Sequence, residues 1–228
     1  MSLYFPKYDL GFIHIPKNAG TSVRHAISHF SSSPMHADGM PSDSHNHANI
    51  FQYVSKLRPN QVGNLETFCV VRNTYDRVVS VFKHWVEEAL KSPNSYDFAG
   101  DLNRDSFKSY VLDIDKKGSQ MFKHTVSQLW YICEHADKDM PTDLEQDDWY
   151  SKNVGLSYKE SLVDHIFYYD ELDALNQFLS DRFSQQITIG HKNQSDSKRP
   201  YRDFYDDECK ETIRNLYQQE IDRFEFTF

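Results

Sequence analysis

The chain is poor in cysteine and has no long apolar run. Three cysteines occur among its 228 residues, and their wide spacing forms neither a disulfide framework nor a metal knuckle. Because free cysteine usually behaves as a small buried apolar residue, we expect Cys69, Cys133 and Cys209 to lie in the core. No apolar stretch approaches the roughly 18 residues that span a bilayer, and no signal-peptide pattern opens the sequence. We therefore expect a cytoplasmic protein without a membrane span, with an additional N-terminal anchor as the open alternative.

An excess of positive charge is also missing. Lys and Arg number 25 against 34 Asp and Glu, which gives a formal net charge of −9. Binding to a nucleic-acid backbone depends on clustered basic residues in excess of acids, so we expect no nucleic-acid partner. The same balance argues against a broad basic groove for a heavily sulfated polyanion, although a local basic patch stays open.

The order of apolar runs predicts an α/β fold. The length is typical of one domain, so we expect a single domain over residues 1–228. Short apolar runs, each followed by a helical pattern, alternate along the chain. This alternation indicates a mainly parallel sheet with helices on both faces. Strands are expected at residues 10–15, 67–71 and 164–169, with a short edge strand at 186–189, and helices at 21–30, 75–90, 171–183 and 204–224.

The segment after the first expected strand has the composition of a phosphate-binding loop. It reads His14-Ile15-Pro16-Lys17-Asn18-Ala19-Gly20-Thr21-Ser22. A loop between a strand and a helix offers free backbone N–H groups and the positive end of the helix dipole to an anion. Gly20 would let the backbone approach a phosphate, Thr21 and Ser22 would donate hydroxyl hydrogen bonds, with Thr21 as the helix cap, and Lys17 would add a cation. Because the lysine precedes the glycine, the segment is not a Walker A loop.

This loop closely resembles the 5′-phosphosulfate loop of the carbohydrate sulfotransferases, the group that contains the heparan and chondroitin sulfotransferases. The resemblance implies a P-loop-nucleotide-kinase-like sulfotransferase fold. It also implies 3′-phosphoadenosine 5′-phosphosulfate (PAPS) as co-substrate, which becomes 3′-phosphoadenosine 5′-phosphate (PAP), and a hydroxyl acceptor on a sugar or polysaccharide. The residues that it assigns to the 5′-phosphosulfate are Pro16, Lys17, Asn18, Ala19, Gly20, Thr21 and Ser22.

Two later segments resemble the same family. Residues 70–80 are similar to its 3′-phosphate segment, in which an arginine at a strand end and a serine in the next helix hold the nucleotide; these positions are Arg72 and Ser80. An arginine suits this role because its planar fork meets two phosphate oxygens. Arg77 is either a phosphate contact or a structural partner of Asp76. The loop after residue 190 resembles the segment that closes over the nucleotide, with Asn193 and Ser195 as its contacts.

Sulfuryl transfer needs a base for the acceptor hydroxyl, and histidine is the usual base near neutral pH. His45-Asn46-His47 resembles the His-x-His element that supplies the base in the family's uronyl 2-O-sulfotransferases, with His45 as first choice and His47 as second. A carboxylate or His36 remains an alternative, as does simple solvent exposure of this loop. Lys17 would stabilise charge on the leaving group. No metal site is expected, because zinc would require further ligands at short spacings.

Two rival functions remain. An ATP-dependent kinase would need carboxylates for magnesium at the strand ends, where Arg72 stands instead. A catalytically inactive nucleotide-binding scaffold of the same fold would keep the nucleotide residues and lose the base. The sequence leaves the acceptor and the oligomeric state open.

Overall fold

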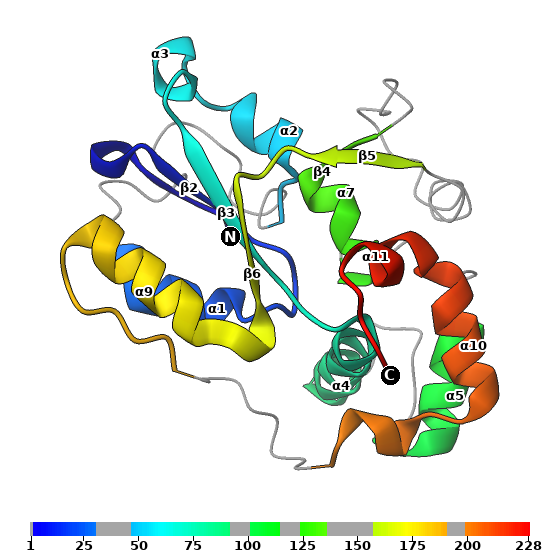
Figure 1. Ribbon diagram of the computed structural model, residues 1–228. Coiled ribbons are helices and arrows are strands. Elements are labelled where there is room, and N and C mark those ends of the chain that lie inside the picture. Colours follow the sequence, from blue (N-terminus) through cyan, green and yellow to red (C-terminus); the bar gives the residue numbers. More distant parts are fainter. Residues whose placement is uncertain (1, 31–46, 92–100, 115–123, 136–156, 191–198) are drawn as a thin grey trace. The chain divides into compact units, whose positions relative to one another are not determined.

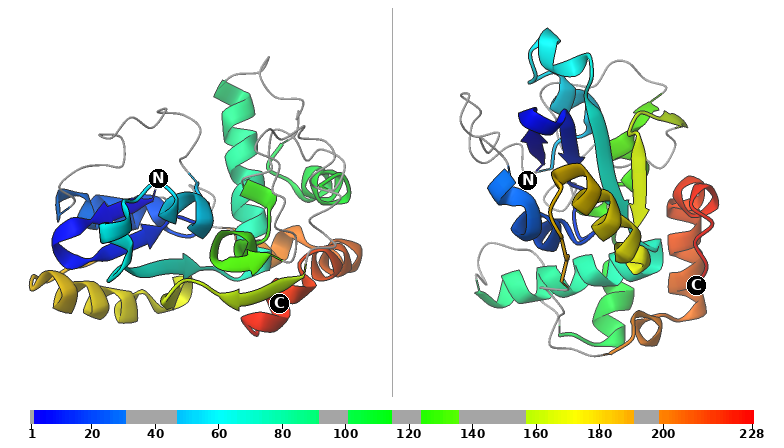
Figure 2. Two further views of the ribbon diagram at one scale, coloured as in Figure 1. Left: turned by 90° about the horizontal axis from the view of Figure 1, so that it is seen from above. Right: turned by 60° about the vertical axis from the view of Figure 1, so that its left-hand side comes forward.

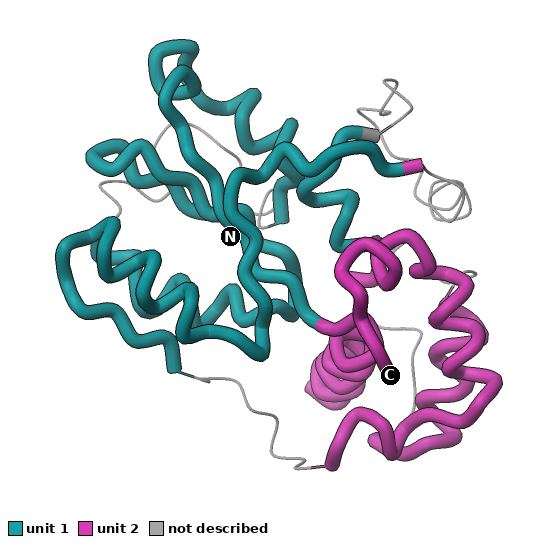
Figure 3. Tube along the Cα trace, in the orientation of Figure 1, with its two compact units in different colours: residues 1–72, 128–134, 158–194 teal, residues 73–127, 135–157, 195–228 magenta. Residues whose placement is uncertain are grey.

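The chain forms two compact units that alternate along the sequence (Figure 3). The computed structural model describes residues 2–30, 47–91, 101–114, 124–135, 157–190 and 199–228. Unit 1 comprises residues 1–72, 128–134 and 158–194, and unit 2 comprises residues 73–127, 135–157 and 195–228. A single domain over residues 1–228 stays a prediction.

Unit 1 is built on a four-stranded sheet of order β1-β2-β3-β6 (Figure 1). Its strands are β1 (Leu3–Phe5), β2 (Leu10–Ile13), β3 (Glu66–Val71) and β6 (His165–Tyr168). The β2–β3 and β3–β6 pairs are parallel, and the β1–β2 pair is antiparallel. The three predicted strands and the mainly parallel sheet are therefore confirmed. The sequence patterns did not predict β1, which is three residues long and ends at Phe5, directly before Pro6.

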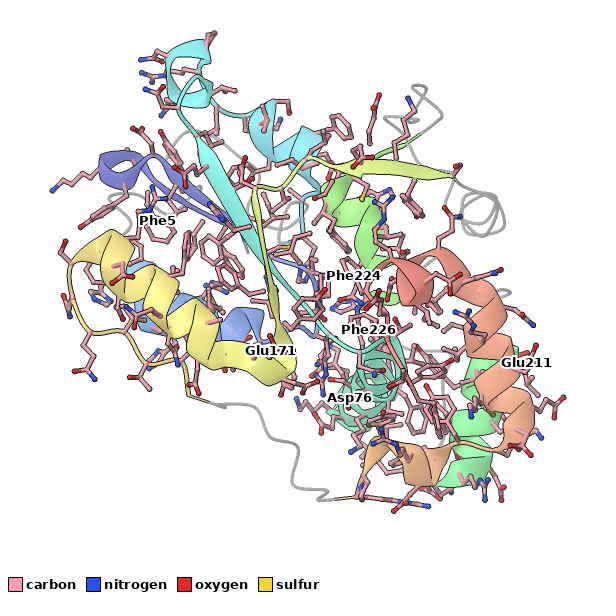
Figure 4. The ribbon with its side chains drawn as sticks, in the orientation of Figure 1. Phe5, Asp76, Glu171, Glu211, Phe224 and Phe226 are labelled. Carbon is pink, nitrogen blue, oxygen red and sulfur yellow. The ribbon has the colours of Figure 1, made fainter. Side chains whose placement is uncertain are left out.

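Both faces of this sheet are covered by helices. Side chains alternate along a strand, so Leu10 and Phe12 of β2 face one way and Gly11 faces the other. The first face packs with α1 (Gly20–Ile27) and α9 (Leu172–Phe183) in one buried apolar cluster. Phe5 of β1, labelled in Figure 4, belongs to this cluster. Its ring meets that of Phe183 of α9 edge to face, with 5.2 Å between the ring centroids.

The second face carries α2 (Ile50–Val54) over β1 and β2. The hydroxyl of Tyr53 on α2 donates to the Leu3 carbonyl at 2.8 Å, and its ring lies directly over Gly11. The remaining elements of unit 1 are η1 (Pro6–Tyr8), η2 (Ser28–Phe30), α3 (Pro59–Val62), α7 (Gln128–Ile132), η3 (Tyr169–Glu171), and the paired strands β4 (Cys133–His135) and β5 (Tyr158–Ser161).

The edge strand expected at residues 186–189 does not form. The N–H of Ile187 donates to Ser180 Oγ at 2.8 Å, and the N–H of Ile189 donates to Asn176 Oδ1 at 2.9 Å. Both acceptors belong to α9. The backbone of this segment thus finds its partners in helix side chains instead of a neighbouring strand, and its two isoleucines still enter the core.

Unit 2 is helical. It contains α4 (Thr74–Lys91), α5 (Arg104–Leu112), η4 (Tyr201–Phe204), α10 (Asp207–Leu216) and α11 (Gln218–Arg223). Helix α4 is seen end-on in Figure 1 and along its length in Figure 2. The single helix expected at residues 204–224 is divided, because Asp206 caps α10 through the Cys209 N–H at 2.8 Å and the chain breaks again at Tyr217.

The cysteines and the apolar character of the helices were both predicted from composition. All three cysteines are free and buried, as predicted. Over the part of the chain that is described, no helix combines the length and the apolar character needed to cross a membrane.

The sheet core of unit 1 depends on Phe68, which is fully buried on β3 and stacks on Phe12 at 5.0 Å. We expect Phe68→Ala to lower the free energy of unfolding by about 3–5 kcal/mol, the usual cost of deleting a buried phenyl ring. Phe51→Ala is the matched control, because Phe51 is 45% exposed, and it should cost less than about 1 kcal/mol. Urea denaturation measures both, and equal losses would contradict this account of the core.

Candidate functional site

The predicted phosphate loop lies between β2 and α1, with an unusual backbone. Lys17 has φ 67° and Ala19 has φ 59°, both in the left-handed region, whereas Asn18 between them does not have a positive φ. Left-handed residues of this kind are one component of the backbone nests in which successive N–H groups face an anion. The loop also follows the carboxyl end of a parallel strand, where open α/β sheets bind their ligands.

Helix α1 begins one residue earlier than expected. Its N-cap is Ala19 and its first residue is Gly20, so Thr21 is not the cap. Alanine has no side-chain oxygen, and it therefore leaves the N–H groups of the first turn without the usual side-chain acceptor at this position. Thr21 is exposed and Ser22 is buried, so the two hydroxyls lie in different surroundings.

Gly20 is required by a contact inside the protein. A Cβ atom at this position would lie 1.9 Å from the imidazole of His14, which is 7% exposed. The His14 ring also stacks on Phe12, with 5.9 Å between centroids, and lies 4.7 Å from the ring of His47. His14 thus fills the space between the end of β2, the start of α1 and the residues that precede α2.

A network of amides ties the loop to the end of β3. Asn18 Nδ2 donates to the Val70 carbonyl at 2.8 Å and to Gln128 Oε1 at 2.5 Å. The Arg72 N–H donates to the same Gln128 oxygen at 2.9 Å, and Gln128 Nε2 donates back to the Arg72 carbonyl at 2.8 Å. Asn18 and Gln128 are 1% and 0% exposed. The Asn18 side chain therefore serves the protein interior, and its backbone is the part that remains for a ligand.

The structure brings Lys17 and Arg72 together, although 54 residues separate them in the sequence. Arg72 Nη1 donates to the Lys17 carbonyl at 2.9 Å, and the guanidinium carbon lies 4.2 Å from the ring centroid of Tyr169. An arginine stacked on a ring keeps its in-plane donors directed sideways. The sequence reading missed Tyr169 and gave Gln128 no role. A tyrosine at the end of an expected strand was the available signal for the first.

Of the other predicted residues, some lie in the described part of the chain and some do not. His47 is half-buried beside His14, and Ser80 is half-buried on α4 in unit 2. Arg77, also in unit 2, is buried and donates to the carbonyls of Val126 and His124 at 3.0 and 2.9 Å, so its role is structural, through backbone carbonyls. Outside the described residues lie His36, His45, Asn193 and Ser195.

A cysteine nucleophile does not fit this site. Cys69 lies on β3, and burial raises the pKa of its thiol far above the ordinary value, with the Cys133 thiol adding to the shift. The thiolate is the reactive form of cysteine. Cys69 therefore stays protonated and packs as an apolar residue.

Comparison with known proteins identifies one family. A family model described as the sulfotransferase family matches residues 2–227, which is nearly the whole chain. Searches of curated proteins and of solved structures gave no significant match.

The contact between Gly20 and His14 can be tested by stability. We expect Gly20→Ala to cost about 1–3 kcal/mol, the usual penalty for an extra methyl group in a packed site. In a His14→Ala background the same change should cost much less, because the ring that the methyl group would strike is gone. Denaturant titration of the four proteins gives the coupling.

Gly63→Ala is the control for a change of the same size. A Cβ atom at Gly63 meets nothing within 4 Å, and its φ of −60° suits alanine. It should leave stability unchanged or raise it by up to about 1 kcal/mol. If Gly20→Ala behaves like Gly63→Ala, the close contact with His14 does not constrain the loop.

Proposed function

The chain belongs to the sulfotransferase family, and from this membership we propose that it transfers a sulfuryl group from PAPS to a hydroxyl of a carbohydrate. The observation that carries the proposal is the loop after β2. Its left-handed residues Lys17 and Ala19 lie at the start of α1, and Arg72 is bonded to the Lys17 carbonyl. We further propose that the fold is the P-loop-nucleotide-kinase-like fold of PAPS enzymes.

The donor is proposed to lie with its 5′-phosphosulfate on residues 16–22. Backbone N–H groups of the loop and of the first turn of α1 would bind the anionic oxygens, and the helix dipole adds to the attraction. Arg72 and Ser80 are proposed to bind the 3′-phosphate. Arg72 suits this role because its planar fork can meet two phosphate oxygens, and because stacking on Tyr169 restricts the plane of the guanidinium. Asn193 and Ser195 complete the proposed set of nucleotide contacts.

The transfer step follows from the chemistry of the sulfate ester. The acceptor oxygen forms a bond to sulfur while the bond between sulfur and the bridging oxygen of the 5′-phosphate breaks. The electron pair of that bond leaves with PAP, and the proton of the acceptor hydroxyl passes to a base. Lys17 is proposed to stabilise the negative charge that builds on the leaving oxygen, an effect that is strongest in the transition state.

His47 and His45 are proposed as candidates for the base. His47 is supported by its place in unit 1, where its ring lies 4.7 Å from that of His14, and a Cβ atom at Gly20 would meet that same His14 ring. His14 therefore lies between His47 and Gly20, the first residue of α1. His45 precedes His47 by two positions in the sequence, and both histidines are therefore substituted in the turnover experiment.

Nucleotide preference tests the donor. We expect PAP to bind more tightly than ATP or 5′-AMP in isothermal titration calorimetry, because the bisphosphate carries the 3′-group that Arg72 is proposed to bind. Arg72→Ala should weaken PAP binding at least about 10-fold, the usual scale for a charge-assisted contact to phosphate, and should leave 5′-AMP nearly unaffected. A preference for ATP would favour the kinase. PAP binding without any transfer to an acceptor would favour the inactive scaffold.

Turnover tests the base. With PAPS carrying radiolabelled sulfate and unsulfated glycosaminoglycan chains as acceptors, loss of the base should lower kcat by about 10²–10⁴. We expect this loss in His47→Ala or His45→Ala with little change in PAP affinity. Lys17→Ala should lower both turnover and affinity. His25→Ala is the matched control, because His25 is exposed on α1. Wild-type turnover in both His45→Ala and His47→Ala would remove these histidines from the reaction.

A further inference from the structure

Beyond its last pair with β2, strand β3 is left with unpaired backbone groups. The parallel register ends at the pair Ile13 and Cys69, because β2 then leaves the sheet to form the phosphate loop. The next groups of β3 that point toward the departing strand would be those of Val70 and Arg72, since successive residues of a strand alternate in direction. Buried backbone groups of this kind require other partners.

Side-chain amides supply those partners. Asn18 Nδ2 donates to the Val70 carbonyl. Gln128 Oε1 accepts from the Arg72 N–H, and Gln128 Nε2 donates to the Arg72 carbonyl. The amide of Gln128 thus binds Arg72 as the backbone of a neighbouring strand would. It is fully buried and comes from α7, 56 residues further along the chain.

The orientation of the Gln128 amide is determined by these contacts. The Arg72 N–H needs an acceptor and the Arg72 carbonyl needs a donor, so Oε1 must face the former and Nε2 the latter. Asn18 must then turn its Nδ2 toward Gln128 Oε1 and toward the Val70 carbonyl, as it does. Among the described residues the buried Asn18 Oδ1 has no hydrogen-bond partner, whereas both polar groups of the Gln128 amide bond the main chain of Arg72.

We propose that Gln128 is a positioning residue for recognition of the 3′-phosphate, acting through the main chain of Arg72. This inference rests on the proposed function, in which Arg72 binds that phosphate. Without the Gln128 amide, the Arg72 peptide loses both hydrogen bonds, and the guanidinium moves with the backbone that carries it. The loop for the 5′-phosphate keeps two independent supports, namely the bond from Asn18 to Val70 and the packing of His14 against Gly20. Loss of Gln128 should therefore weaken 3′-phosphate recognition more than 5′-phosphate recognition.

The test compares PAP with 5′-AMP, which lacks the 3′-phosphate, by isothermal titration calorimetry. The selectivity is the ratio of the two dissociation constants. Gln128→Met keeps the length of the side chain and removes its amide, and it should lower the selectivity about 10-fold, the usual scale for losing one charge-assisted hydrogen bond to phosphate. Gln177→Met is the matched control, because Gln177 is exposed on α9 in the same unit, and it should keep the wild-type selectivity.

A double-mutant comparison separates positioning from general damage. In the Arg72→Ala background, Gln128→Met should leave the selectivity unchanged, because the group that it positions is absent. A purely structural role would lower the folded fraction and weaken both nucleotides alike, so the ratio would not move. Retention of wild-type selectivity by a folded Gln128→Met protein would overturn the inference and leave the proposed function intact. Absence of any PAP preference in the wild-type protein would instead remove the proposed function and, with it, this inference.

A measurement on the wild-type protein covers the case in which Gln128→Met does not fold. The side-chain amide of Gln128 and the backbone amide of Arg72 can be followed by nuclear magnetic resonance during titration with PAP and with 5′-AMP. Both signals should shift with PAP and shift much less with 5′-AMP. Equal shifts with the two nucleotides, or none with PAP, would overturn the inference.

Discussion

The departure of β2 from β3 is the constraint on which the candidate site depends. A loop can form after β2 only if the strand turns out of the sheet, and turning out leaves backbone groups of β3 without a strand partner. An unpaired buried peptide group costs about 1–3 kcal/mol. The turn therefore requires both acceptors and donors that replace β2 as hydrogen-bond partners of β3. Asn18 and Gln128 provide them. Asn18 is itself a loop residue, so its hydrogen bond to the Val70 carbonyl both supplies a partner for β3 and restrains the loop.

The loop is held in a conformation that its sequence does not favour. Lys17 and Ala19 are neither glycine nor asparagine, yet both have left-handed φ values, and each such residue costs on the order of 1 kcal/mol. The packing of His14 into the space left by Gly20 and the buried bonds of Asn18 offset this cost. A backbone restrained from both ends presents its N–H groups in a fixed arrangement, and binding an anion then requires little further ordering.

Features that depend on short segments could be predicted from the sequence, and features that depend on distant partners could not. The strands at β2, β3 and β6 and the helices α4 and α9 follow from local apolar patterns, and they lie where the sequence indicated. The loop residues were recognised through a motif within nine positions. The role of Gln128 was not, because it appears only when residues 56 and 110 positions away come within hydrogen-bond distance. The edge strand at residues 186–189 was wrong for a different reason: its N–H groups donate to side chains of α9 that are only 7 and 13 positions earlier, which an apolar pattern does not indicate.

Net charge is a poor guide to the site for a related reason. The chain carries −9 overall, but in salt near 0.1 M charges beyond about 10 Å are largely screened, so the acids of distant surfaces have little influence on a bound anion. The cations of the chain differ in how they are held. Arg182 is paired with Glu66, which lies at the opposite end of β3 from Arg72, and hydrogen bonds from His165 and Arg182 lower the pKa of the Glu66 carboxyl. Arg72 donates to the Lys17 carbonyl and stacks on the Tyr169 ring, and both contacts restrict the orientation of its guanidinium. Local packing therefore determines how this planar cation is oriented, which the net charge of the chain does not describe.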